Sequence, residues 1–187
     1  MYRLYLDEVG TDDMTNLEED NHRYLSLTGV VMKVSHARDH LHPACDWIKA
    51  NVFDHDPDDP LIFHRYDIRA RRKGFYRLRD PDKLALFDKA IVRLFSSTEY
   101  TVISALVDKK ALAAKEEWRN QHPYHFLMEI IVEKYVQLLE RKKACGDIMP
   151  EGRKGKKDQA LQKAFLEVCQ NGTYYVGKSR IAERLTT

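Results

Sequence analysis

The sequence has few cysteines and no long apolar run. Its three cysteines, Cys45, Cys145 and Cys169, are an odd number with wide, irregular spacing, which fits neither a disulfide framework nor a Cys-x-x-Cys zinc or redox site. No stretch reaches the ~18 apolar residues of a membrane-spanning helix, and the first ten residues carry acids where a signal peptide needs its apolar core. We therefore expect a cytoplasmic protein that is neither secreted nor inserted in a membrane.

Several common catalytic motifs are also missing. The sequence contains no Gly-x-Ser-x-Gly elbow, no phosphate-binding P-loop and no Gly-x-Gly-x-x-Gly turn, so serine hydrolases, P-loop NTPases and dinucleotide-binding enzymes lose their main support. The 187 residues are 43% apolar and 32% charged, which is the composition of an ordinary globular protein. This length favours one α/β domain with its own core.

Charge is distributed unevenly, although the net charge is only +2. Residues 7–20 hold seven acids and no Lys or Arg, whereas residues 64–79 hold seven Lys or Arg and one acid. Residues 141–157 form a second basic segment, with seven bases against two acids. Tyr66, Phe75 and Tyr76 are interleaved with the first basic segment, a pattern that favours a phosphate-tracking surface with stacking positions. A solvated protein face is the alternative interpretation.

Hydrophobic patterning predicts alternating strands and helices. Strands are expected over residues 2–7, 23–34, 61–66 and 100–108, with a last one ending near Glu151 and a bulge at Gly29. Helices are expected over residues 36–51, 81–96, 112–118, 123–143 and 157–170. The stripe of the 123–143 helix that carries His125, Glu129 and Glu133 is expected to face solvent. This order predicts an α/β fold with a mixed sheet of about five strands flanked by helices.

Three predicted strands end in or immediately before an acid. These acids are Asp7 with Glu8, then Asp108, then Glu151. If the strands are neighbours, their carboxylates gather within a few ångströms, and like charges so close need a cation to remain ionised. Mg²⁺ or Mn²⁺ suits such oxygen ligands, and two ions about 4 Å apart can support phosphodiester cleavage. The alternative is that acids at strand ends simply meet solvent.

Four segments of the sequence resemble a known family. The opening YLDEVG is similar to the hydrophobic-Asp-Glu-Ser-Gly strand that begins proteins of the domain-of-unknown-function 3800 family. LIFHRYDIR, YTVISALVDKK and PEGRKGKKDQALQKAF resemble that family's later blocks, so the resemblance covers nearly the whole chain. Val9 stands where the family usually has Ser. The C-terminal helix with a Gln-hydrophobic-Ala-Asp segment has no counterpart here.

The resemblance implies a single RNase H-like domain over residues 1–187, missing its last helix, with a divalent-metal nuclease type of site. Carried over by position, it makes Asp7, Asp108 and Glu151 metal ligands, with Glu8 beside Asp7 as a further catalytic residue. His64 and Lys109 are auxiliary candidates, and so is Asp158, which is expected to cap its helix. The basic side chains expected to contact nucleic acid are Arg65, Arg69, Arg71, Arg72, Lys73, Arg153 and Lys156.

Taken together, the residues and the resemblance predict an RNase H-like nuclease that uses Mg²⁺ or Mn²⁺ to hydrolyse phosphodiester bonds in DNA or RNA. A catalytically inactive nucleic-acid-binding module with the same fold is the first alternative, and a protein-interaction scaffold is the second. Nucleic acid is the expected partner. A second copy or a partner chain that covers the sheet is also compatible with the sequence.

Overall fold

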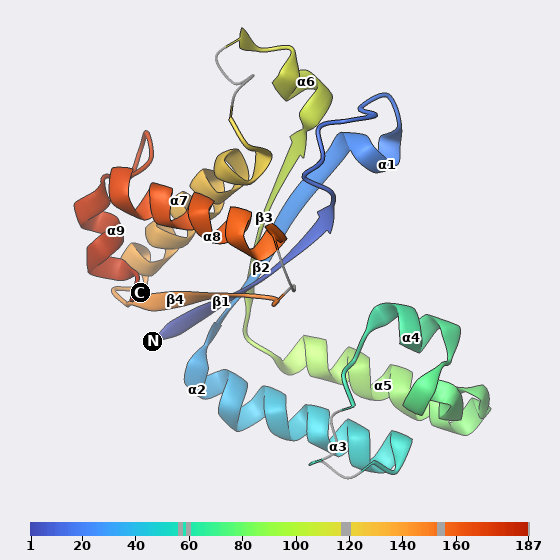
Figure 1. Cartoon of the computed structure of the whole chain (residues 1–187). Helices are drawn as coiled ribbons and strands as arrows, with labels where there is room; N and C mark the ends of the chain where they lie inside the picture. The colour runs from blue at the N-terminus through green and yellow to red at the C-terminus, as the bar shows by residue number, and fades with distance from the viewer. Residues whose placement is uncertain (56–57, 59–60, 117–120, 153–155, 187) are drawn as a thin grey trace. The chain divides into compact units, whose positions relative to one another are not determined.

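The structure is a computed structural model that describes residues 1–55, 58, 61–116, 121–152 and 156–186 (Figure 1). Contacts divide the chain into two compact units. Unit 1 comprises Met1–Lys33 and Tyr100–Thr187, and unit 2 comprises Val34–Glu99. Within the described ranges, no helix is both long enough and apolar enough to cross a membrane.

Unit 1 contains a mixed four-stranded sheet. Its strands are β1 (Tyr2–Gly10), β2 (Tyr24–Lys33), β3 (Thr101–Asp108) and β4 (Gly146–Pro150), in the spatial order β3-β2-β1-β4. β2 is antiparallel to both β1 and β3, whereas β4 is parallel to β1. β1, β3 and β4 therefore run in the same direction and end on the same side of the sheet.

The α/β class and the mixed sheet flanked by helices are confirmed, but the strand expected at residues 61–66 is wrong. Residues 61–64 have no regular structure, and helix α4 (Arg65–Ala70) follows them in unit 2. Leu61 is buried and Phe63 packs in the core of unit 2, while Ile62 is 75% exposed. The apolar run thus packs against helices, and the sheet has four strands among the described residues instead of about five.

Alternation along the strands gives the sheet one apolar face. Leu4 and Leu6 of β1 and Leu25 and Leu27 of β2 are almost fully buried on that face. The bulge expected at Gly29 is wrong, because Gly29 pairs regularly with Leu6. A Cβ atom at Gly29 would lie 2.6 Å from Leu4 Cδ1, so the glycine makes room for the Leu4 side chain.

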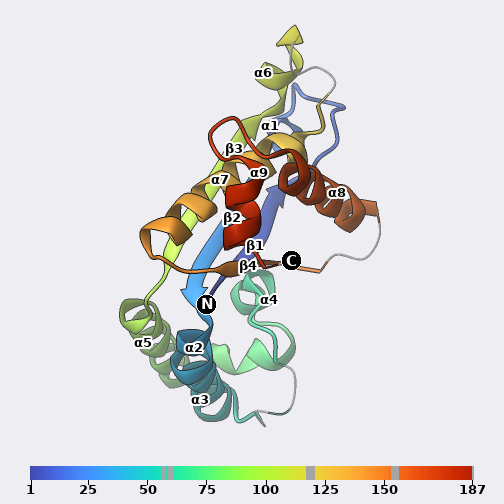
Figure 2. The same ribbon diagram turned by 90° about the vertical axis from the view of Figure 1, so that its left-hand side faces the viewer.

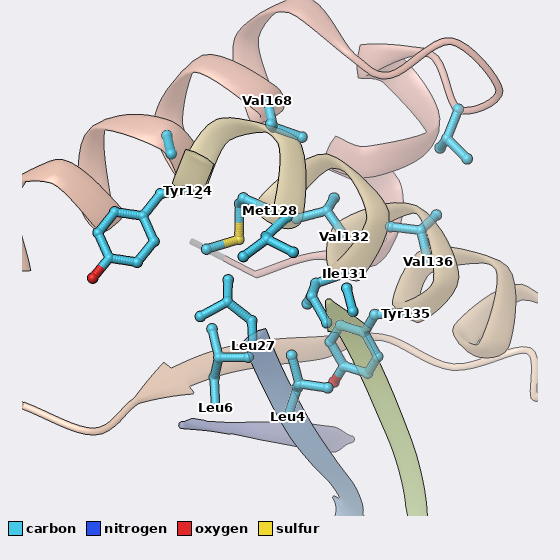
Figure 3. Close-up of a cluster of buried hydrophobic side chains, with 14 of the residues drawn as sticks. Leu4, Leu6, Leu27, Tyr124, Met128, Ile131, Val132, Tyr135, Val136 and Val168 are labelled. Carbon is cyan, nitrogen blue, oxygen red and sulfur yellow. The ribbon is translucent and has the colours of Figure 1, made fainter. Parts of the chain in front are cut away.

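Helix α7 (Pro123–Arg141) covers the apolar face of the sheet (Figures 2 and 3). Ile131, Val132 and Tyr135 of this helix are fully buried among the sheet leucines. Helices α8 (Lys156–Asn171) and α9 (Lys178–Arg184) pack on α7 from the other side. The solvent-facing stripe expected on α7 is therefore wrong: Glu133 is only 8% exposed, and its Oε2 accepts a hydrogen bond from the Thr173 hydroxyl.

Unit 2 contains helices and no strand among its described residues. It begins with α2 (Val34–His36), a π-helical turn at Ala37–Leu41 and α3 (His42–Phe53), and continues with α4, a 3-10 turn at Lys73–Arg79 and α5 (Pro81–Ser97). Phe53, Phe75 and Phe87 pack edge to face in its core, with Phe53 5.1 and 5.6 Å from the other two ring centroids. Two short helices of unit 1, α1 (Asp20–Arg23) and α6 (Lys109–Ala113), complete the fold.

Candidate functional site

Asp7 and Glu151 lie on neighbouring parallel strands. β1 and β4 pair up to Leu6 and Pro150, and the Glu151 N–H then donates to the Leu6 carbonyl oxygen at 2.8 Å. Both acids line one open hollow of about 650 Å³ on the face of the sheet opposite α7. The Glu8 N–H donates to Asp7 Oδ1 at 2.7 Å and fixes the orientation of that carboxylate. The structure therefore brings two of the four expected carboxylates to one site.

Glu8 points to the other face of the sheet. Adjacent residues of a strand project to opposite sides, so the side chain that follows Asp7 turns toward α7. There the Tyr124 hydroxyl, which is fully buried, donates to Glu8 Oε2 at 2.6 Å. Glu8 thus contacts the helix layer and is separated by the sheet from the hollow that Asp7 lines.

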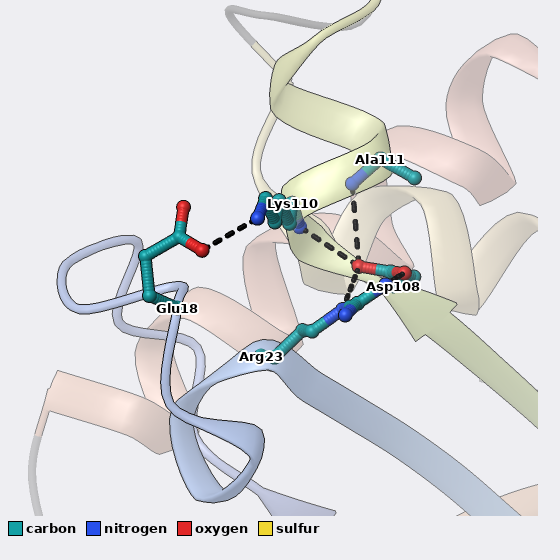
Figure 4. Close-up of polar contacts among 5 residues, drawn as sticks. All are labelled: Glu18, Arg23, Asp108, Lys110 and Ala111. Carbon is teal, nitrogen blue, oxygen red and sulfur yellow. Dashed lines mark hydrogen bonds and ion pairs between the residues drawn. The ribbon is translucent and has the colours of Figure 1, made fainter.

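Asp108, the last residue of β3, contacts Arg23 and the first residues of α6 (Figure 4). Arg23 donates to both of its carboxylate oxygens, with Nη2 2.5 Å from Oδ2. Asp108 Oδ1 also accepts from the backbone N–H groups of Lys110 and Ala111, so Asp108 is the N-cap of α6. The hydrogen bond from Arg23 lowers the pKa of Asp108 to about 2. These contacts hold Asp108 ionised without a metal.

Strand register separates Asp108 from Asp7. Asp7 is opposite Thr28, and Thr28 is opposite Ser104, so Asp108 lies four residues further along β3 and two strands away. That offset is about 13 Å along the strands and about 10 Å across them. Two catalytic metal ions lie only about 4 Å apart, so these carboxylates cannot share such a pair. Within the described part of the chain, no group of three or more His, Cys, Asp or Glu could hold a metal ion.

Lys109 binds the backbone of the acidic loop that follows β1, at Thr11 and Asp13. Its side chain is fully buried, and its ammonium group donates to the backbone carbonyl oxygens of Thr11, at 2.6 Å, and of Asp13. Burial lowers the pKa of Lys109, and the negative charges of Asp13 and Asp12 oppose that shift. Both bonds go to the backbone, so the structure gives Lys109 a loop-anchoring contact, away from the hollow of Asp7 and Glu151.

The first basic segment forms an exposed surface on unit 2. We call it the basic surface, and it consists of Arg65, Arg69, Arg71, Arg72 and Lys73 with the aromatic residues Tyr66 and Tyr76. All seven side chains are exposed. The Arg72 guanidinium lies 5.5 Å from the Tyr66 ring centroid and donates to its hydroxyl at 3.2 Å. This combination of cations and exposed rings can contact phosphates and stack on bases.

His64 and Lys73 meet a buried acid at the base of this surface. Asp67 is 7% exposed, and its Oδ2 lies 2.6 Å from Lys73 Nζ and 3.8 Å from His64 Nδ1. Asp67 thus forms a small cluster of polar side chains with Lys73 and His64 in unit 2. His64 is exposed, and its ring lies near Asp67 and 6.5 Å from the Tyr66 ring centroid, so it adjoins the basic surface of unit 2.

The second basic segment is divided by β4. Arg141, Lys142 and Lys143 are exposed at the end of α7, before β4 begins. Arg153, expected to contact nucleic acid, lies outside the described residues. Lys156 and Asp158 belong to the first turn of α8, but their side chains are outside the described part of the structure.

Sequence reasoning missed the partners that hold two of the expected acids. Arg23 and Tyr124 are far in the sequence from Asp108 and Glu8. Alternation alone indicates that Asp7 and Glu8 face opposite ways, so this part of the arrangement has a signal in the sequence. Comparison with models of protein families, with curated proteins and with solved structures finds no match for this chain.

Proposed function

We propose that the chain is a divalent-metal-dependent nuclease-like protein that hydrolyses phosphodiester bonds in DNA or RNA, with Asp7 and Glu151 as the metal ligands. The observation that carries this proposal is that both carboxylates line one hollow where β4 ends beside β1, which continues past Asp7 to Gly10. Mg²⁺ is commonly held by one or two carboxylates together with substrate phosphates, so this donor set fits the ion. The proposal keeps the expected RNase H-like relationship, but it reduces the expected metal ligands from three to two, because Asp108 is no longer one of them.

The chain's own residues have distinct tasks in this proposal. Asp7 and Glu151 hold the ion and orient the phosphate, and the backbone bond from Glu8 keeps Asp7 aligned. When bound, the ion would lower the pKa of a coordinated water and neutralise charge on the phosphate. Asp108 has a structural role, because its hydrogen bonds connect the end of β3 to α6 and to Arg23. The basic surface contributes affinity for the nucleic-acid backbone.

The test is cleavage of a labelled single strand and duplex, each of DNA and RNA, with Mg²⁺ or Mn²⁺. Asp7→Asn and Glu151→Gln should each lower the rate by a hundredfold or more, on the order of what a positioned charged group contributes. Asp108→Asn is the matched control and should retain the wild-type rate at a temperature where it is folded. Equal rates for wild type and Asp7→Asn would remove the assignment.

A nucleic-acid-binding module without catalysis is the second candidate. It is favoured by the contacts of Asp108 with Arg23 and of Glu8 with Tyr124, because they direct two expected catalytic acids to structural tasks. Salt-dependent binding of nucleic acid without cleavage by any metal would support this candidate and exclude the first.

A further inference from the structure

Unit 2 contains a second hollow, formed where α3 faces α5. Its volume is about 610 Å³, within the range of small-ligand sites. Ala44 and Ile48 of α3 and Ala90 and Leu94 of α5 line it with apolar surface. The members on each helix are three to four residues apart, so each helix presents one stripe to the hollow. We call this hollow the α3–α5 groove.

Two cations line the same groove. Lys89 and Arg93 of α5 are one helical turn apart, and both are exposed. Neither has an ion-pair partner among the residues that the structure describes, and no acid described there lines the groove. Like charges one turn apart weaken a helix, so this pair is a cost to α5 unless an anion binds it. The groove is therefore complementary to a negatively charged ligand.

Trp47 gives the groove an aromatic wall. This side chain lines the hollow from α3 and is 49% exposed. A half-exposed indole that lines the same groove as two cations offers a flat surface for stacking together with positive charge for a phosphate. Proteins that bind single-stranded nucleic acid combine these two features, because every base has a face that stacks and every nucleotide carries a charge.

We infer that the α3–α5 groove binds one nucleotide of a single-stranded nucleic acid. The base stacks on Trp47, and the adjoining phosphate contacts Lys89 and Arg93. A duplex keeps its bases stacked inside, so only an unpaired base reaches this wall. The inference deepens the proposed function by naming single strands as the substrate class, and it rests on that function only for the choice of nucleic acid over another acidic polymer.

The experiment follows Trp47 fluorescence while a ten-nucleotide oligothymidylate is added to the protein. The buffer contains EDTA, which removes divalent metal and prevents cleavage. The sequence has two tryptophans, so the protein carries Trp118→Phe to leave Trp47 alone. Stacking should quench the signal. Lys89→Glu with Arg93→Glu should raise the Kd by about tenfold or more, and Trp47→Leu, measured with a labelled strand, should raise it by about tenfold, as expected when one base no longer stacks.

The matched control reverses two exposed charges of unit 1, Lys115→Glu with Lys178→Glu, and alters net charge by the same amount. It should change the Kd less than twofold. Equal weakening by both double variants would show a net-charge effect and overturn the inference. So would the absence of quenching, or quenching by polyglutamate at the same concentration, which would identify an acidic-peptide site. Circular dichroism of each variant confirms that it is folded.

The two proposals fail separately. Cleavage that depends on Asp7, together with no quenching of Trp47, would overturn the inference that the α3–α5 groove binds a nucleotide. It would leave the nuclease assignment in place. Quenching and weakened binding by the Lys89 and Arg93 variants, in a protein that cuts nothing, would support the groove and refute the nuclease.

Discussion

Two tyrosines of α7 provide a matched test of how the polar groups under the sheet are satisfied. Tyr124 and Tyr135 are both fully buried in the same core. The Tyr124 hydroxyl donates to Glu8, whereas the Tyr135 hydroxyl has no hydrogen-bond partner in the described structure. Burial raises the pKa of Tyr135, so its phenol stays neutral. Replacement by phenylalanine removes only the hydroxyl in each case. The two variants should therefore change the free energy of unfolding in opposite directions.

The expected magnitudes follow from these contacts. Tyr124→Phe removes a hydrogen bond to a charged group and should lower the free energy of unfolding by about 2 kcal/mol. Tyr135→Phe removes an unsatisfied buried hydroxyl and should raise it by about 1 kcal/mol. The difference of about 3 kcal/mol corresponds to about 1.5 M urea in the unfolding midpoint, if the slope is about 2 kcal/mol per M.

The assay is urea unfolding at neutral pH, followed by circular dichroism. A double-mutant cycle with Glu8→Ala isolates the Tyr124 bond, because alanine has no acceptor and the interaction energy should disappear when either partner is absent. If Tyr124→Phe and Tyr135→Phe lose equal stability, the assignment of Glu8 to the helix face is wrong.

The remaining predictions concern charges at Asp108 and on the basic surface. Because the pKa of Asp108 is about 2, below its ordinary 3.8, its contribution to stability should be complete above about pH 4 and disappear as the pH falls through 2. Urea midpoints between pH 2 and 6 should therefore fall less steeply for Asp108→Asn than for wild type, and parallel curves would contradict the Arg23 contact. Arg65→Ala with Arg69→Ala should weaken binding of a single strand and reduce the slope of log K against log salt by about 0.7 for each phosphate that the variant no longer neutralises. An unchanged slope would show that these two residues contact no phosphate.

The sequence predicts most elements of the sheet and its main covering helix, because their patterns are local. Alternation predicts strands over residues 2–7 and 100–108, which correspond to β1 and β3 although β1 continues past Asp7 to Gly10, and the apolar pattern predicts the helix over residues 123–143 that forms α7. The short run at residues 61–64 misleads, since a strand and a partly buried coil look alike over three apolar positions. The exposed side of α7 is also mispredicted, because coverage by α8 depends on contacts between distant segments.

The candidate site depends on strand order, which local patterns do not specify. β3 pairs with β2 and lies at the sheet edge away from β4, so Asp108 is remote from Glu151 although both follow strands that end on the same side. Only the β1–β4 pairing brings Asp7 and Glu151 together. The parallel partner of β1 thus decides which acids meet.

Mn²⁺ titration followed by electron paramagnetic resonance tests most directly whether Asp7 and Glu151 form a shared cation site. Wild-type protein should bind Mn²⁺ with a signal that Asp7→Asn and Glu151→Gln each abolish, while Asp108→Asn retains it. Wild-type affinity in the Asp7 and Glu151 variants, or its loss only in Asp108→Asn, would contradict the account.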